Sequence, residues 1–135
     1  MINVCCAIIR GSDRFLAVQR GPESKHPWQW EFPGGKIRED ETPEACIVRE
    51  IEEELLVTVA VDTQLEAVEF DYGFRKVRLI PFVCRIVSGT ILLTEHVGLK
   101  WLRLDEFDTI TWSGGDRDSI HKNQKGLMQL VHKSF

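Results

Sequence analysis

The sequence predicts an α/β fold in which a mixed sheet is sandwiched between helices, an α/β/α arrangement. Apolar runs of strand length precede and follow a helical segment near the middle of the chain, and a second amphipathic helical pattern closes it. No linker, internal repeat or low-complexity segment interrupts the 135 residues. A chain of this length buries most of the apolar surface that its unfolded state exposes, so we expect residues 1–135 to form a single domain.

The first third of the chain is expected to hold strands and one loop. Apolar runs at 2–10 and 15–19 flank the polar residues 11–14, which is typical of a β-hairpin. Residues 21–29 are polar and contain two prolines, so they predict a loop. A short strand is expected at 30–32, ended by the Pro-Gly-Gly that follows.

A helix is expected from Thr42 to about Leu55. Thr42 is a favourable N-cap, and Pro43 suits the first helical position, where no amide donor is needed. Val48, Ile51 and Leu55 recur at helical spacing, which predicts that their face packs against the sheet.

The second half of the chain is predicted to be mainly strands. These are expected at 65–71, 76–86, 91–93 and 98–102. The first two flank a short turn and predict an antiparallel pair. Residues 104–107 predict a helical turn, and apolar residues recurring between 118 and 133 predict a closing amphipathic helix.

Composition and charge restrict the class of protein. A net charge of −4 and a pI near 5.6 argue against binding of nucleic-acid polymers, which calls for a basic face. No apolar run approaches the length of a membrane span, and the N-terminus lacks the basic start of a secretory signal. The four cysteines have no paired spacing, so reduced thiols are expected. We expect a cytoplasmic monomer or homodimer with no membrane partner.

The glutamates near the end of the central helix carry the most chemical information. Glu50, Glu53 and Glu54 share one arc, because residues at i, i+3 and i+4 are neighbours on a helix. Their repulsion, at a helix end where the macrodipole disfavours anions, indicates that a cation binds there. Oxygen ligands suit Mg²⁺, for which Mn²⁺ can substitute. The alternative is a solvated acidic face paired with Arg49, which also describes Glu52 on the opposite side.

The helix is part of a longer pattern of fixed residues. Residues 35–57 read G-x5-E-x7-R-E-I-x-E-E-x-L-V, which includes Gly35, Glu41 and Arg49 at set spacings. This resembles the Nudix box, the signature of the Nudix hydrolase family, with Leu56 where the family has glycine. Leucine disfavours the left-handed conformation that glycine adopts at a helix end. We therefore expect Leu56 to change the helix end by extending it.

Within that family the chain looks most like the MutT type, and the run WEFPGGK at 30–36 supports this placement. The resemblance implies Mg²⁺-dependent attack of water on the β-phosphorus of a nucleoside triphosphate, which releases the monophosphate and pyrophosphate. The implied metal ligands are Glu50, Glu53, Glu54, Glu95 and a carbonyl of Gly34 or Gly35. Arg49 would orient a carboxylate, and Glu53 or Glu54 would take the proton of the water.

A set of substrate contacts is expected, partly from the resemblance and partly from the flat faces of aromatic rings. These are Arg20, Trp30, Phe32, Gly34, Phe74 and Asp116. Arg20 matches a position that contacts phosphate, Asp116 matches one that reads the edge of the base, and the rings offer faces for stacking. Arg20 has an alternative as a surface arginine, and Glu95 has one as a loop carboxylate without a role. The four histidines are expected at the surface.

Three functions are weighed. The first is a MutT-type pyrophosphohydrolase acting on an oxidised or methylated dNTP or on CTP, in sanitation of the nucleotide pool. The second is hydrolysis of another nucleoside-diphosphate-linked substrate, such as a nucleotide sugar, a dinucleoside polyphosphate or capped RNA. The third is a catalytically silent domain that binds a nucleotide or a protein, which the retained glutamates disfavour. In both enzymatic cases the partner is a nucleotide substrate.

Overall fold

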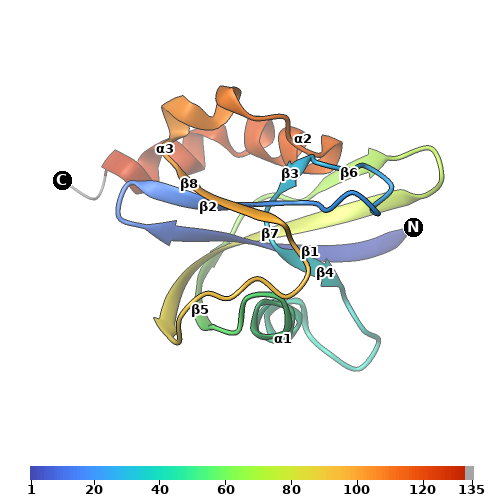
Figure 1. Cartoon of the computed structure of the whole chain (residues 1–135), viewed down its shortest axis with the longest axis horizontal. Helices are drawn as coiled ribbons and strands as arrows, with labels where there is room; N and C mark the ends of the chain where they lie inside the picture. The colour runs from blue at the N-terminus through green and yellow to red at the C-terminus, as the bar shows by residue number, and fades with distance from the viewer. Residues whose placement is uncertain (133–135) are drawn as a thin grey trace.

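Helices cover both faces of one mixed sheet in the computed structural model of the protein, which describes residues 1–132 (Figure 1). Helix α1 lies on one face, and helices α2 and α3 lie on the other. The elements in chain order are β1 (Ile2–Gly11), β2 (Arg14–Gln19), β3 (Trp30–Glu31), β4 (Gly34–Lys36), α1 (Pro43–Leu55), β5 (Thr58–Gln64), β6 (Val68–Asp71), β7 (Lys76–Ser88), β8 (Gly98–Leu102), the 3₁₀ helix η1 (Leu104–Thr109), α2 (Gly114–Lys122) and α3 (Gln124–His132). The predicted α/β/α fold is confirmed.

Strand β1 lies at the centre of the eight-stranded sheet. It pairs in parallel with β7, from Ile2 opposite Val77 to Ile9 opposite Cys84, and antiparallel with β2 and β4. Strand β7 also pairs with β5 and β6, and β2 also pairs with β3 and β8. The sheet therefore extends on both sides of β1, and the hairpin of β1 and β2 is confirmed.

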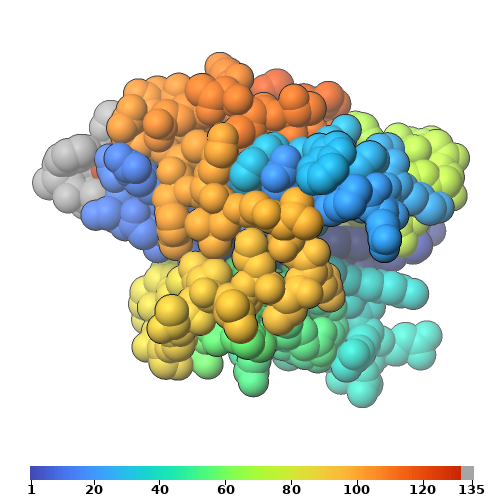
Figure 2. Space-filling model, in the orientation of Figure 1, coloured from blue at the N-terminus to red at the C-terminus, as the bar shows by residue number. Residues whose placement is uncertain are grey.

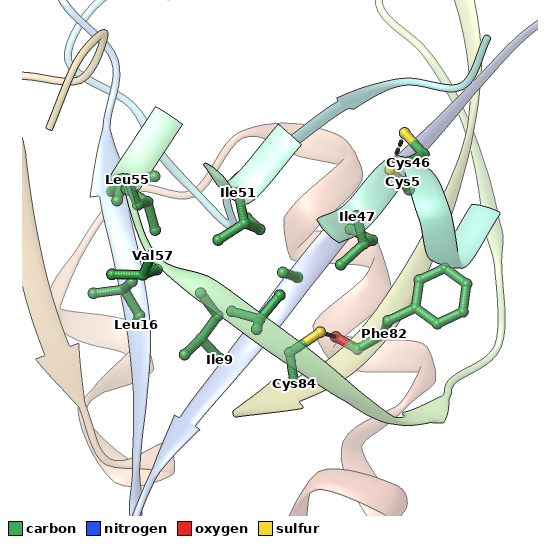
Figure 3. Close-up of a cluster of buried hydrophobic side chains, with 13 residues drawn as sticks. Cys5, Ile9, Leu16, Cys46, Ile47, Ile51, Leu55, Val57, Phe82 and Cys84 are labelled. Atoms are coloured by element: carbon green, nitrogen blue, oxygen red, sulfur yellow. Dashed lines mark hydrogen bonds between the residues drawn. The ribbon is translucent and has the colours of Figure 1, made fainter. Parts of the chain in front are cut away.

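The side chains of β1 alternate between two hydrophobic cores. Cys5, Ala7 and Ile9 pack on the side of α1, whereas Cys6 and Ile8 pack on the side of α3. Figure 3 shows the first of these cores, in which side chains of α1 pack against side chains of the sheet, including those of β7. Because neighbouring strand residues point to opposite faces, a strand covered on both sides contains a continuous apolar run.

Helix α1 begins as predicted. The side chain of Thr42 accepts a hydrogen bond from the backbone N–H of Ala45 at 3.1 Å, and Pro43 occupies the first turn. The buried apolar face is formed by Cys46, Ile47, Ile51 and Leu55. Val48 is only half-buried, so its predicted place in this face is wrong.

The helix ends at Leu55, and Leu56 takes the left-handed conformation, with φ 57° and ψ 31°. The N–H of Leu56 donates to the carbonyl of Glu52 at 3.0 Å. The predicted extension of the helix is therefore wrong. Leucine adopts the conformation that usually favours glycine, at a steric cost of about 1–2 kcal/mol.

Several strand predictions need correction. Gly34 and Gly35 do not merely end a strand, because they form β4 and pair with β1. Residues 58–64 form β5, which the sequence pattern did not predict. Residues 91–93 are not a strand, because this segment packs on the end of α1. The predicted strand at 98–102 and the helical turn at 104–107 are confirmed.

The predicted closing helix at 118–133 is two helices, so its prediction as one piece is wrong. Helix α2 starts earlier, at Gly114, and Asn123 separates it from α3. The Asn123 side chain bonds to the backbone N–H and carbonyl of Glu66, at 2.8 and 2.9 Å. An amide that bonds to a neighbouring loop favours a break in the helix. Residue 133 lies outside the described residues.

All four cysteines are buried free thiols, as predicted. The sulfurs of Cys5 and Cys46 lie 2.7 Å apart between β1 and α1 (Figure 3), and burial raises the pKa of both thiols. Within residues 1–132, no helix has the length and apolar composition needed to cross a membrane.

Candidate active site

The glutamates of α1 differ widely in exposure. Glu54 is 2% exposed, the Glu50 side chain is largely covered, and the Glu53 side chain is 52% exposed. Glu52 is exposed, in agreement with its predicted place on the opposite side. The helix therefore presents a row of carboxylates that runs from a buried position to the surface.

Of the glutamates in this row, Glu54 has the environment that disfavours the charged carboxylate most. Burial, the hydrogen bond to Glu50 and the charges of Glu50 and Glu95 together raise the pKa of Glu54 to about 10. Its Oε2 atom is buried and has no hydrogen-bond partner among residues 1–132. A buried carboxyl oxygen without a partner is costly. A cation bound at this point would remove that cost.

Arg49 joins three carboxylates near the surface. It donates to Glu41 at 2.6 and 3.0 Å, to Glu50 at 3.0 Å and to Glu53 at 3.4 Å. The hydrogen bonds from Arg49 lower the pKa of Glu41 to about 2. Since Glu54 is not among its partners, Arg49 orients the outer carboxylates and leaves the buried one unpaired.

The segment before β8 packs on the C-terminal end of α1 (Figure 2). The N–H of Leu92 donates to Leu55, and Thr94 donates to the carbonyls of Glu53 and Glu54 at 2.8 and 3.1 Å. These bonds satisfy carbonyls that a helix end leaves without partners. They also bring Glu95 near the other glutamates, although its own side chain is exposed.

The two glycines of β4 let this strand pass close to β1 and α1. A side chain at Gly35 would overlap the carboxyl group of Glu50, and one at Gly34 would overlap the backbone of Cys5. The Gly35 carbonyl faces the thiols of Cys5 and Cys46, at 3.4 and 3.8 Å. The close approach at Gly35 thus limits where the Glu50 carboxylate can lie.

A second set of charged groups lies where three strands end. Val18 of β2 lies opposite both Glu31 of β3 and Leu99 of β8. This pairing brings together Arg20, which follows β2, Glu31, and His96, which precedes β8. Arg20 Nε donates to Glu31 Oε1 at 2.7 Å, and His96 Nε2 lies 2.9 Å from Glu31 Oε2.

Asp116 lies in the first turn of α2 and is 5% exposed. Its Oδ1 accepts a hydrogen bond from the backbone N–H of Phe32 at 3.0 Å. Burial, followed by the charge of Glu31, raises the pKa of Asp116 to about 8. Asp116 lines a cavity of about 100 Å³ together with Arg20 and Glu31. Apolar and aromatic side chains form much of the remaining lining, among them Val4, Cys6, Phe32, Tyr72, Val77 and Leu79.

A wider groove of about 500 Å³ continues from this cavity. The two share Arg20, Glu31, Phe74 and Arg75 in their linings. The groove then reaches Lys25, Glu95 and His96. It therefore leads from the cavity beside Asp116 toward the acidic end of α1.

The predicted aromatic contacts occupy different environments. Phe32 is buried and packs on Trp112, with ring centroids 4.8 Å apart, while one part of it lines the cavity. Trp30 is half-buried and lines neither the cavity nor the groove. Phe74 is 48% exposed at the entrance, with Lys25 Nζ 4.0 Å from its ring centroid. Of the three rings, Phe74 is the most exposed to solvent.

Sequence reasoning missed part of this arrangement. The prediction that His96 is a surface residue is wrong, because its side chain is 6% exposed. Glu31, Lys25 and Arg75 were not singled out either. Glu31 could have been identified from the sequence, because it is a charged residue within a short apolar strand. Nothing local marks His96, because its neighbours are brought to it by strand pairing.

These residues fit a divalent cation whose shell is completed by water and phosphate. The unpartnered oxygen of Glu54 and the clustered charges of Glu50 and Glu95 provide hard oxygen ligands. Within residues 1–132, no three acidic, imidazole or thiol side chains already converge on one point. Mg²⁺ tolerates this, because it keeps several waters and takes further ligands from the phosphates of a substrate.

Residues 1–122 match the NUDIX domain family, and the chain belongs to that family. It is a hydrolase of the MutT type that acts on phosphoric anhydride bonds. It is 32% identical over 106 residues to the CTP pyrophosphohydrolase of Escherichia coli (strain K12), covering 78% of each chain. It is 43% identical over 98 residues to the 8-oxo-dGTP diphosphatase of Proteus vulgaris, covering 72% of this chain and 86% of that one.

Solved structures agree with this family. The E. coli ORF135 protein superposes with a TM-score of 0.80 at 28% identity, covering 93% of this chain and 89% of that one. The MutT protein from Methanosarcina mazei Go1 superposes with a TM-score of 0.81 at 27% identity, covering 93% and 94%. The resemblance of the sequence to the MutT type is therefore confirmed at the level of fold and family.

Proposed function

We propose that this protein is a Mg²⁺-dependent nucleoside triphosphate pyrophosphohydrolase that converts a modified dNTP or NTP to its monophosphate and pyrophosphate. Its role would be sanitation of the nucleotide pool in the cytoplasm. The observation that carries the proposal is the continuity of the cavity beside Asp116 with the groove that reaches Glu95. A nucleotide whose base enters the cavity would place its phosphates along this groove, near the glutamates of α1.

The charges along the groove suit a polyphosphate. Arg20, Lys25 and Arg75 lie on its walls and attract phosphate, and Glu50, Glu53, Glu54 and Glu95 attract a divalent cation, with help from a carbonyl of Gly34 or Gly35. When bound, Mg²⁺ would supply charge neutralisation for the phosphates and would activate water. Glu53 or Glu54 would accept a proton from the attacking water, and Arg49 holds Glu50 in place.

The cavity offers a donor beside an acceptor. Asp116, with a pKa of about 8, is protonated at neutral pH and can donate to a base. Glu31 stays a carboxylate, because the hydrogen bond from His96 and the charge of Arg20 outweigh its burial and lower its pKa. Each nucleobase presents a donor next to an acceptor on its Watson–Crick edge, so this pair of groups suits a base in general. The choice of cytosine or an oxidised guanine therefore rests on the two relatives, with Phe32 as a wall of the cavity and Phe74 at its entrance.

The deciding experiment is a pyrophosphate and phosphate release assay across a nucleotide panel, with Mg²⁺ and with EDTA. The panel contains 8-oxo-dGTP, the four dNTPs, CTP, 5-methyl-dCTP, ADP-ribose and a dinucleoside polyphosphate. We expect Mg²⁺-dependent release of pyrophosphate, highest for one modified dNTP or for CTP. Preferred cleavage of ADP-ribose or the dinucleoside polyphosphate would contradict the triphosphate assignment. Absence of turnover with every compound would favour a silent binding domain.

A further inference from the structure

His96 lies between carboxylates that come from different parts of the fold. Its Nε2 atom lies 2.9 Å from Oε2 of Glu31, and its Nδ1 atom lies 3.9 Å from Oε1 of Glu54. Glu31 lines the cavity beside Asp116, whereas Glu54 belongs to the acidic end of α1. One buried imidazole ring therefore stands between the two halves of the site.

The contact on the Glu31 side is complete. Glu31 receives Arg20 at Oε1 and faces His96 with Oε2, so each of its oxygens has a partner. A carboxylate has no proton to donate, so Nε2 of His96 is the donor in this hydrogen bond. Because Glu31 in turn holds the Arg20 guanidinium, His96 supports the position of Arg20.

The contact on the Glu54 side is open. Nδ1 of His96 and Oε2 of Glu54 are buried, and neither has a hydrogen-bond partner within the described part of the chain. The 3.9 Å between Nδ1 and Oε1 is too long for a direct hydrogen bond. Since buried polar atoms are normally hydrogen-bonded, a water that bridges Nδ1 and the Glu54 carboxyl group would supply the partner that Nδ1 and Oε2 each lack.

We propose that His96 is a positioning residue that joins the two halves of the site: Nε2 holds the Glu31–Arg20 pair beside the nucleotide, and Nδ1 holds a water against Glu54. This inference rests on the proposed function for the nature of the substrate. Through the water, His96 orients the Glu54 carboxylate toward the cation. Groups that orient a metal ligand in this way typically change the metal affinity by about 10–100-fold when they are removed.

Two substitutions separate the two contacts of the ring. A glutamine amide reaches about as far from the backbone as Nε2, and an asparagine amide reaches about as far as Nδ1. His96→Gln therefore keeps a donor toward Glu31 and loses the group that faces Glu54, and His96→Asn does the reverse. His121→Gln, which changes an exposed histidine of α2, is the matched control.

Two binding measurements test the proposal without turnover. Mn²⁺ is titrated without nucleotide and followed by electron paramagnetic resonance, and the binding of dCMP and 8-oxo-dGMP is followed by calorimetry in EDTA. We expect His96→Gln to weaken Mn²⁺ binding about tenfold and to leave nucleotide affinity within about threefold of wild type. We expect His96→Asn to weaken nucleotide binding about tenfold, with Mn²⁺ affinity within about threefold.

The proposal is supported if His96→Gln weakens mainly Mn²⁺ binding and His96→Asn weakens mainly nucleotide binding. Equal losses of both affinities in both variants, with a lower unfolding temperature, would make His96 a packing residue and overturn it. Unchanged affinities in both variants would overturn it as well. Wild-type protein that binds Mn²⁺ but neither binds these monophosphates nor cleaves the nucleotide panel contradicts the proposed function. In that case the Mn²⁺ titration of His96→Gln still decides whether His96 orients Glu54.

Discussion

A carboxyl group that is as buried as Glu54 has lost most of its hydration, and it needs a positive partner to remain ionised. Arg49 bonds to Glu41, Glu50 and Glu53 instead. Burial, followed by the nearby carboxylates, raises the pKa of Glu54 to about 10. When no cation is bound, the buried carboxyl group of Glu54 stabilises the folded protein less than a neutral side chain would. The benefit of the carboxylate therefore lies in binding a cation.

Glu54→Gln tests this benefit, because it replaces the carboxylate with a neutral group of similar shape. We expect pyrophosphate release to fall by about 10²–10⁴-fold. The unfolding temperature in EDTA should stay within about 2 °C of wild type or rise. Both are measured against Glu52→Gln, which changes a glutamate on the exposed side of the same helix. Full activity in Glu54→Gln, or an equal loss in Glu52→Gln, would show that the site lies elsewhere.

Asp116 gives the stability of the fold a dependence on pH. The folded protein holds the pKa of Asp116 at about 8, far above the value near 4 of an unfolded chain. Between these values the folded state binds a proton that the unfolded state lacks. The stabilisation is therefore fully present below about pH 4 and is lost as the pH rises through about 8.

Asp116→Asn should remove this dependence while keeping an oxygen for the N–H of Phe32. We expect the free energy of unfolding of the wild type to fall, relative to that of Asp116→Asn, by up to about 1.4 kcal/mol for each pH unit between 6 and 8. Urea unfolding at several pH values measures the difference. Asp118→Asn, on the same helix but half-exposed, should follow the wild type. Parallel curves for Asp116→Asn and wild type would refute the assignment.

At the scale of elements, the end of α1 combines an unusual backbone with a docked loop. Leu56 holds the left-handed conformation, and Thr94 of the following loop bonds to the carbonyls of Glu53 and Glu54. The loop thus completes the hydrogen bonding of a helix end that carries two of the proposed metal ligands. This explains why the apolar residues 91–93 do not extend the sheet, because the backbone of this segment hydrogen-bonds to the end of the helix.

The conformation of Leu56 predicts an inverted preference between glycine and alanine. Alanine retains the Cβ atom that makes a positive φ unfavourable, and glycine does not. We expect Leu56→Gly to be more stable than Leu56→Ala by about 1 kcal/mol, as measured by urea unfolding. At exposed Glu52, inside the same helix, the order should be reversed, with alanine better by about 1 kcal/mol. The same order at both positions would show that Leu56 is not left-handed in solution.

At the scale of the whole molecule, cation binding and folding are linked. The chain carries a net charge of −4, and four of its 21 acidic residues lie together at 50–54, where Glu54 is buried. A ligand that binds the folded state alone raises its stability in proportion to the logarithm of its concentration. The protein should therefore be more stable with Mg²⁺ than without it.

We expect millimolar MgCl₂ to raise the unfolding temperature by about 5 °C relative to EDTA, which corresponds to about 1–2 kcal/mol. Differential scanning calorimetry measures this shift, and NaCl at equal ionic strength controls for screening. The shift should be small or absent in Glu54→Gln. An equal shift in that variant would mean that Mg²⁺ stabilises the fold at another place.

Sequence reasoning predicted the hairpin of β1 and β2, the start of α1 and the relation to the Nudix family, because each depends on residues that are close along the chain. It failed where distant segments compete for the same residues. Residues 91–93 are apolar enough for a strand but pack on a helix end. The closing helix is interrupted at Asn123, because that side chain bonds to Glu66, which is far away in the sequence.

The sequence by itself determined the acidic row of α1, because helical geometry places Glu50, Glu53 and Glu54 on one side at fixed spacing. The tertiary structure decided which of these carboxylates is buried and what faces it. Glu31 and His96 come together because β2 pairs with both β3 and β8. Side chains that meet through strand pairing depend on the register between strands, and no local pattern in the sequence encodes that register.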